Sequence, residues 1–265
     1  MSALPRGLVG VVHLPPLPGD PRPSEGFDGA LRFALRDADA LAAGGLSAVV
    51  VENFGSAPFP KGSAGDRLPP HQVAFMAVVA RELKARFTHV GINCLRNDAR
   101  SALGVAAATG SDFVRVNVHT GAYVTDQGLI EGEAAESLRY RAALGGGPRL
   151  TADVLVKHAA PLAPLTATQA THEALDRGLA DAVIVSGTGT GQPVDRAILA
   201  EVRAAAGDRP VWIGSGLTPA NAPELAPLTD AAIVGTWLKE DGDVARPVDP
   251  ERVKRLLDAT TPLFR

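Results

Sequence analysis

The chain has 265 residues, of which 46% are hydrophobic and only 5% aromatic, and its formal net charge is −3 at pH 7. This length suits one domain spanning residues 1–265, with a large aliphatic core. The slightly acidic balance and the lack of a dense Lys/Arg cluster argue against a nucleic-acid-binding surface. A single cysteine, Cys94, excludes an internal disulfide and any metal site built from several cysteines.

The N-terminal residues lack the basic-then-apolar pattern of a signal peptide. No apolar stretch reaches the roughly 18 residues that suggest a membrane-spanning helix. We therefore expect a cytoplasmic protein without a transmembrane segment. Peripheral contact with a membrane is left open.

Eight short runs rich in β-branched residues recur along the chain, as expected for strands buried on both faces of a parallel sheet. They are Leu8–Leu14, Leu46–Asn53, His89–Leu95, Phe113–Val118, Leu150–Val156, Ala182–Gly187, Val211–Gly216 and Ala231–Trp237. Alanine-rich amphipathic segments separate them, among them Phe27–Ala43, His71–Arg86, Glu133–Leu144 and Val194–Ala206. Eight alternating pairs in a chain of this length predict an α/β fold, a single (β/α)8 TIM barrel.

Two connections that follow strands are long and rich in proline, Pro15–Gly26 and Phe54–Pro70. We interpret both as ordered loops above the mouth of the barrel, where such enzymes keep their lids. The alternative is a proline-rich ligand for a partner that reads PxxP motifs.

The last two predicted strands each end in a small-residue turn. Glycine lets backbone N–H groups approach an anion closely, and a following helix start adds partial positive charge. Turns at these two strands are the usual phosphate site of a (β/α)8 barrel. We therefore expect Ser215 and Gly216, together with Gly235 and Thr236, to bind the phosphate of a small molecule.

A glycine-rich run, Ser-Gly-Thr-Gly-Thr-Gly at 186–191, follows the sixth predicted strand. It lacks the Gly-Lys-Ser/Thr ending of a P-loop and the acidic residue that a dinucleotide fold places on the next strand. In a barrel its backbone would donate hydrogen bonds beside the phosphate turns, so Ser186, Gly187 and Gly189 join the predicted phosphate site. A purely structural tight turn is the alternative.

Polar residues stand near the carboxyl ends of most predicted strands, where a barrel enzyme carries its site. They are His13, Glu52, Asn93, Arg115, Asn117, Asp153, Lys157 and Ser186. Alternation places Arg115 and Asn117 on one face of their strand, and Asp153 with Lys157 on one face of theirs. Because buried ion pairs stabilise poorly compared with apolar packing, this grouping favours a functional pocket over an inward salt-bridge network.

Within that pocket we expect Glu52 and Asp153 to act as general acid and base, with His13 as a proton carrier. Asn93, Arg115 and Asn117 suit an oxygen-rich substrate. Lys157 is a further catalytic candidate; it either forms a Schiff base or pairs with a phosphate or carboxylate.

No metal or other cofactor is expected. A divalent metal held by His13, Glu52, Asp153 and His158 is the alternative, but no paired-histidine spacing occurs and His158 has the opposite parity from Asp153. Cys94 falls on the face opposite Asn93, which indicates packing rather than nucleophilic chemistry.

The chain resembles the BtpA/SgcQ family across nearly its whole length. The resemblance lies in VGVVHLPPLPGDP at 9–21, VVVENFGSAPF at 49–59, GINCLRNDA at 91–99, FVRVNVHTGAYVTDQGLIEG at 113–132, LRYR at 138–141, ADVLVKHA at 152–159, GLADAVIVSGTGTG at 178–191, WIGSGLTPANAPEL at 212–225 and IVGTWLKEDG at 233–242. It implies a barrel of the ribulose-phosphate-binding group, although the metal-binding histidines of that group's epimerases are missing here. Asp126, in the fourth of these segments, is one more expected substrate-binding residue.

The family's namesake is linked with accumulation of photosystem I, and other relatives have been loosely labelled as acting on nucleosides or nucleotides. Two hypotheses follow from the resemblance and the residues together. The first is an enzyme of lyase, isomerase or nucleosidase type acting on a phosphosugar or nucleoside-like substrate. The second is a non-catalytic assembly or stability factor that uses the barrel as a scaffold. A homo-oligomer is plausible under either.

Overall fold

A computed structural model describes residues 3–156, 158–187, 189 and 191–265. Within them, eight parallel strands close into a barrel in the order β1-β11-β10-β9-β7-β4-β3-β2. The strands are β1 (Gly7–His13), β2 (Ala48–Glu52), β3 (His89–Asn93), β4 (Phe113–Val116), β7 (Arg149–Val154), β9 (Ala182–Val185), β10 (Val211–Ile213) and β11 (Ala231–Val234). The predicted TIM barrel is therefore confirmed.

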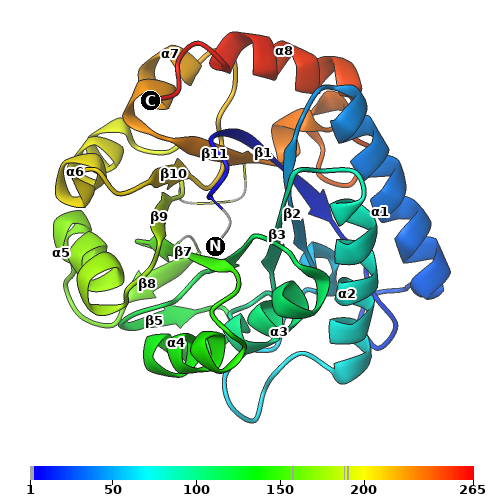
Figure 1. Ribbon diagram of the computed structural model, residues 1–265, viewed down its shortest axis with the longest axis horizontal. Helices are drawn as coiled ribbons and strands as arrows, with labels where there is room; N and C mark the ends of the chain where they lie inside the picture. Colours follow the sequence, from blue (N-terminus) through cyan, green and yellow to red (C-terminus); the bar gives the residue numbers. More distant parts are fainter. Residues whose placement is uncertain (1–2, 157, 188, 190) are drawn as a thin grey trace.

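Helices surround this barrel (Figure 1). They are α1 (Gly26–Ala43), α2 (Pro70–Lys84), α3 (Ala99–Thr109), α4 (Ala134–Ala143), α5 (Ala167–His172) with a π-helical turn η2 (Glu173–Arg177), α6 (Arg196–Ala206), α7 (Ala222–Leu225) with η3 (Ala226–Leu228), and α8 (Pro250–Thr260). Short 3-10 turns precede α2 and α8, namely η1 (Phe54–Ser56), η4 (Thr236–Leu238) and η5 (Glu240–Gly242). No described helix is long and apolar enough to cross a membrane.

The inside of the barrel is filled by apolar side chains in its amino-terminal half. Phe113 and Trp212 meet edge to face there, with ring centroids 5.2 Å apart, among residues such as Val9 and Ile184. Gly91 leaves room for the Phe113 ring, because a Cβ on Gly91 would lie 2.2 Å from it. These apolar side chains close the amino-terminal half of the barrel. The polar residues that follow on the same strands lie at its carboxyl end.

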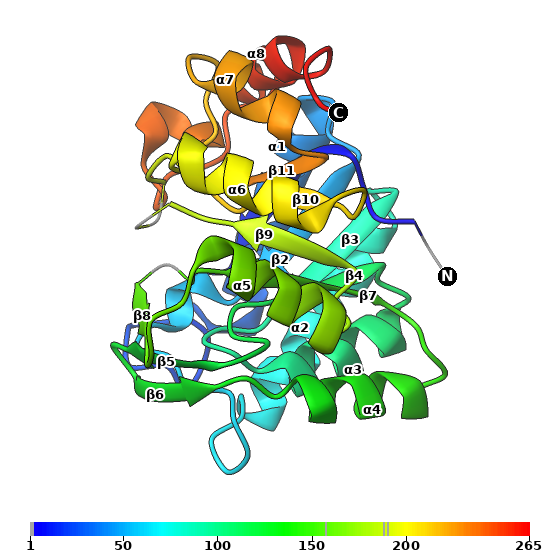
Figure 2. The ribbon, with the colours of Figure 1, turned by 90° about the vertical axis from the view of Figure 1, so that its left-hand side faces the viewer.

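A small antiparallel sheet, absent from the sequence prediction, extends from this barrel. It contains β5 (Ala122–Thr125), β6 (Gly128–Glu131) and β8 (Ala159–Pro161) in the order β6-β5-β8. Figure 2 shows it at the opposite end of the molecule from the N-terminus. The loops after β4 and β7 thus add a wall to the rim around the carboxyl ends of the strands.

All eight predicted strands exist, but each ends earlier than predicted. The fourth ends at Val116 rather than Val118, because the backbone N–H and carbonyl of Val118 are hydrogen-bonded to the Asn97 side chain instead of to a neighbouring strand. A side chain thus takes the place of the strand ladder at the rim.

Candidate functional site

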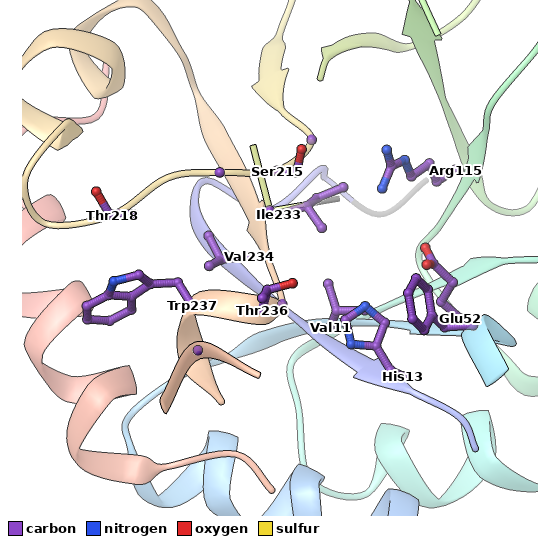
Figure 3. A pocket seen from close by; sticks show the side chains of 16 residues that line it. Val11, His13, Glu52, Arg115, Ser215, Thr218, Ile233, Val234, Thr236 and Trp237 are labelled. Carbon is purple, nitrogen blue, oxygen red and sulfur yellow. The ribbon is translucent and has the colours of Figure 1, made fainter. Parts of the chain in front are cut away.

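A cavity of about 200 Å³ opens at the carboxyl ends of β1, β2, β4, β10 and β11. Figure 3 shows His13, Glu52 and Arg115 on one side of it and Thr218 with Trp237 on the other. The cavity is lined by Val11, His13, Glu52, Phe54, Arg115, Gly191, Gly214, Ser215, Gly216, Thr218, Ile233, Val234, Gly235, Thr236, Trp237 and Gly242. Four residues predicted to bind phosphate, Ser215, Gly216, Gly235 and Thr236, are among them.

The turn after β10 needs glycine at two positions. A Cβ on Gly214 would lie 2.3 Å from the Ser186 hydroxyl oxygen, and one on Gly216 would lie 2.0 Å from the Gln192 carbonyl oxygen. Gly216 also has a φ of +77°, in the left-handed region that side chains rarely adopt. Between them, the buried hydroxyl of Ser215 has no hydrogen-bond partner among the described residues. The turn therefore carries a buried polar group without a partner beside the cavity.

The turn after β11 lies against the histidine of β1. A Cβ on Gly235 would lie 2.4 Å from Cε1 of His13, so glycine allows the imidazole to approach the backbone. The His13 ring also packs against Phe54, with centroids 4.7 Å apart and planes inclined by 50°. His13 is thereby held at the edge of the predicted phosphate site, where Thr236 projects into the same cavity (Figure 3).

Arg115 on β4 and Asp153 on β7 form a buried bidentate ion pair. Nε and Nη2 of Arg115 each donate to a different carboxylate oxygen of Asp153 at 2.9 Å. Nδ2 of Asn117 donates to the second oxygen at 3.1 Å, and Nη2 of Arg115 reaches the Ser186 hydroxyl at 3.3 Å. Burial alone lowers the pKa of Arg115, but the charge and hydrogen bonds of Asp153, with the charge of Glu52, raise it above its ordinary value. Arg115 is therefore a fixed cation.

Glu52 occupies a different environment from Asp153. Its Oε2 accepts a hydrogen bond of 2.7 Å from Nδ2 of Asn93 on the neighbouring strand, and the residue is 7% exposed. Glu52 lines the first cavity and also a second one, whereas Asp153 lines neither and its side chain is 0% exposed. Of the two carboxylates, Glu52 is the one that a bound molecule can touch.

The second cavity, of about 240 Å³, adjoins the first through Glu52, Phe54 and Arg115. Its remaining lining comes from the loops after β1, β2, β3, β4 and β7 and from the β5–β6 hairpin. Those residues are Arg22, Ala57, Phe59, Leu95, Arg96, Asn117, Asp126 and His158. Residues of both proline-rich connections, predicted to lie above the barrel mouth, contribute to this lining.

Two asparagine side chains fix the rim under these loops. Asn53 donates to the Leu95 carbonyl and accepts from the Leu95 N–H, at 3.2 and 2.7 Å. Asn97 pairs in the same two-way manner with Val118, at 2.8 and 2.7 Å. Buried backbone groups beyond the strand ends are thus satisfied without a longer strand.

Most predicted site residues meet around the two cavities. The first holds His13, Glu52 and Arg115 with the two turns predicted to bind phosphate, and the second holds Arg115, Asn117 and Asp126. Asn93, Asp153 and Ser186 stand behind them, hydrogen-bonded to lining residues.

Three other predicted residues are not placed on a cavity. Gly187 and Gly189 line neither of the two, and a Cβ on Gly187 would lie 2.4 Å from the Gln192 carbonyl oxygen, so Gly187 packs inside its own loop. Lys157 lies outside the described residues.

The described residues contain no group of three or more His, Cys, Asp or Glu side chains placed to hold a metal ion. Cys94 is buried, its sulfur 3.6 Å from that of Met76, and burial raises its pKa well above the usual value. A thiol in that state is a packing group, as its parity predicts.

Sequence reasoning missed several lining residues, above all Phe54, Phe59 and Arg96. Alternation along a strand identifies inward positions only while the strand lasts, and these residues follow the ends of β2 and β3. Arg96 sits in the segment GINCLRNDA, and Phe54 and Phe59 in VVVENFGSAPF, so the family resemblance was the one signal available.

Comparison with known proteins gives a family and a fold. The family model for the BtpA family matches residues 5–261. The photosystem I biogenesis protein BtpA of Synechocystis sp. is 44% identical over 253 residues, covering 95% of this chain and 87% of that protein.

Two solved structures share the fold at low sequence identity. Thiamine phosphate pyrophosphorylase of Pyrococcus furiosus has a TM-score of 0.60 and 11% identity, covering 98% of this chain and 97% of that one. Orotidine 5′-phosphate decarboxylase of Pyrococcus horikoshii has a TM-score of 0.57 and 15% identity, covering 96% and 99%. The barrel is thus a common one, and it is the sequence match that decides the relationship: the chain belongs to the BtpA family.

Proposed function

We propose that this protein is an enzyme that binds a phosphorylated small molecule and acts on it through the carboxylate of Glu52. One observation carries the proposal: the two glycine turns after β10 and β11 open into the same cavity as Glu52, His13 and Arg115. Two proteins that share the fold have names that refer to phosphate compounds, which agrees with this reading.

The phosphate would lie between the Ser215–Gly216 and Gly235–Thr236 turns. Backbone N–H groups and the Ser215 and Thr236 hydroxyls are donors of the kind that bind phosphate oxygens. His13, held beside Gly235, supplies a further group at the edge of that site. The rest of the molecule would extend toward Glu52 and Arg115, where the two cavities join.

Glu52 is the proposed general acid or base. Asn93 donates to one of its oxygens and so fixes the orientation of the carboxylate. Arg115 would bind an oxygen that gains negative charge during the reaction, because a preorganised cation stabilises such charge without having to move. Asp153 then acts by holding Arg115 rather than by touching the substrate.

The experiment that tests this proposal is a turnover screen of phosphosugars and phosphorylated nucleoside-like compounds, run beside direct binding of each compound. The proposal expects at least one compound to bind and be converted, and Glu52→Gln to remove conversion while binding persists. Binding without any conversion across the panel would favour a non-catalytic protein.

A second candidate function is that of an assembly factor. Two observations favour it: the name of the Synechocystis relative, and three exposed apolar side chains, Val124 and Leu129 on the small sheet and Leu162 directly after it. The buried charges weigh against it, since a scaffold gains nothing from placing Glu52, Arg115 and Asp153 at a barrel mouth.

A further inference from the structure

The second cavity has a lining unlike that of the first. Four of its residues are apolar, Phe54, Ala57, Phe59 and Leu95, and two of these carry phenyl rings. Flat rings pack against phenyl groups in offset or edge-to-face arrangements that add to simple burial of area. This wall suits a flat, largely apolar group.

Asn117 adds a specific polar requirement. The residue is 2% exposed, and its Nδ2 is engaged by Asp153. Its Oδ1 has no hydrogen-bond partner among the described residues, although the residue lines the cavity. A buried acceptor left unsatisfied costs about 1–3 kcal/mol. A ligand with an N–H or O–H donor would satisfy it.

Arg96, which is 5% exposed, lines the same cavity and carries guanidinium donors. Burial lowers the pKa of Arg96 below its ordinary value, and the charge of Arg115 adds to this effect. The negative charges of Asp153, Asp126 and Glu52 oppose it. These three carboxylate charges favour the cation of Arg96. The cavity therefore does not require a second anionic group on the ligand.

We propose that the second cavity binds a flat nitrogen heterocycle that carries an N–H or O–H donor for Asn117. This inference rests on the proposed function for the other half of the ligand, because the phosphate occupies the first cavity. The substrate class is then a sugar phosphate that carries a heterocyclic base. The bond between sugar and base lies near Glu52 and Arg115, the charged residues that line both cavities.

The test compares ring-bearing with ring-free ligands by calorimetric titration. The probes are inorganic phosphate, ribose 5-phosphate, the 5′-monophosphates of adenosine, guanosine, uridine and cytidine, and the four free nucleosides. At least one nucleoside monophosphate is expected to bind ten-fold or more tightly than ribose 5-phosphate. Phe59→Ala is expected to remove most of that gain and to leave the affinity for ribose 5-phosphate within about two-fold. Phe59→Leu, which keeps an apolar side chain, is expected to fall between, and it replaces the alanine variant if that one does not fold.

Thr236→Val is the matched variant in the first cavity. It is expected to weaken the binding of ribose 5-phosphate and of the nucleoside monophosphates, and to leave the affinity for the free nucleosides unchanged. The inference is overturned if no ring-bearing probe binds more tightly than its ring-free counterpart, or if Phe59→Ala weakens both kinds equally. A third outcome is that free nucleosides bind in a Phe59-dependent way while no phosphate compound binds better than its unphosphorylated form. That result would support ring binding in the second cavity and would contradict the proposed phosphate site in the first.

Discussion

At the scale of single residues, Glu52 and Asp153 show how two buried carboxylates take different roles. Asp153 accepts three hydrogen bonds, two from Arg115 and one from Asn117, and lines neither cavity. Glu52 accepts one of 2.7 Å from Asn93 and lines both cavities. From the sequence, both residues were predicted to act in acid–base chemistry. Alternation along a strand shows which face a residue occupies, but it does not show which partners the residue contacts there.

Glu52→Gln is expected to lower kcat by about 10²- to 10⁴-fold, the usual contribution of a general acid or base. Affinity for inorganic phosphate should stay within about two-fold, because the turns proposed to bind phosphate follow other strands, β10 and β11. Steady-state kinetics on a compound converted in the screen, with calorimetry alongside, measures both. Glu82→Gln, at an exposed helix position, is the control. Full turnover by Glu52→Gln would remove the residue from the mechanism.

Asp153→Asn is expected to destabilise the fold by about 3–5 kcal/mol, because it leaves the buried cation of Arg115 without its counter-charge. Urea unfolding measures the loss. Asp176→Asn serves as the control, since that carboxylate pairs with Arg209 and His172 at the surface, where ion pairs contribute little to stability. A loss at Asp153 no larger than at Asp176 would contradict the buried ion pair.

His119 predicts a pH dependence of stability. Its ring lies 2.7 Å from the Gly178 carbonyl oxygen, and burial lowers its pKa from 6.5, with that hydrogen bond opposing and Arg141 assisting. As the pH falls below 6.5, the unfolded chain takes up a proton that the folded chain does not. The free energy of unfolding should therefore decrease, by at most about 1.4 kcal/mol per pH unit.

Urea unfolding of the wild type and of His119→Gln at intervals from pH 7.5 to 5.5 checks this. The variant keeps a hydrogen-bond donor but does not titrate, so its stability should vary less with pH. An unchanged slope in the variant would show that other groups cause the dependence.

At the scale of elements, the sequence predicts regular structure well and the rim of the barrel poorly. The eight barrel strands and helices such as α1 and α8 carry clear periodicity and end signals; Asp249 caps α8 at Glu251 with Pro250 in the first turn. The small sheet has no such pattern, since β5 and β6 are four residues each and half exposed. These short strands pair with one another, and residues that follow β4 and β7 cover their buried side chains.

The turn after β10 gives the sharpest test at this scale. Gly216→Ala combines an unfavourable φ of +77° with a contact at 2.0 Å to the Gln192 backbone, so it must displace the loop beside the proposed phosphate site. We expect at least a ten-fold loss of phosphate affinity by calorimetry.

Gly110→Ala is the matched control for that variant. Its φ is +71°, yet nothing lies within 4 Å of the added Cβ, so it carries the backbone strain alone. It should cost about 1–2 kcal/mol of stability and leave phosphate affinity unchanged. Equal affinities in both variants would separate the turn from the phosphate site.

At the scale of the whole molecule, closure of the barrel explains how many of the site residues could be predicted from the sequence. His13 and Thr236 are more than 200 positions apart, yet β1 pairs with β11, with Gly10 opposite Val234, so both reach one cavity. Once eight strands are recognised, the residue that follows the apolar part of each is a site candidate. Phe59 and Arg96 escaped because their positions depend on how loops pack against one another, for which no periodicity exists.

The most direct measurement is thermal unfolding of the purified protein with inorganic phosphate and phosphorylated sugars, against chloride at equal ionic strength. A ligand present at about 100 times its Kd stabilises the folded state by about 2.7 kcal/mol. We expect a higher Tm with at least one phosphorylated compound, and no such rise in Gly216→Ala. A folded protein whose Tm does not respond to any phosphorylated compound would contradict it.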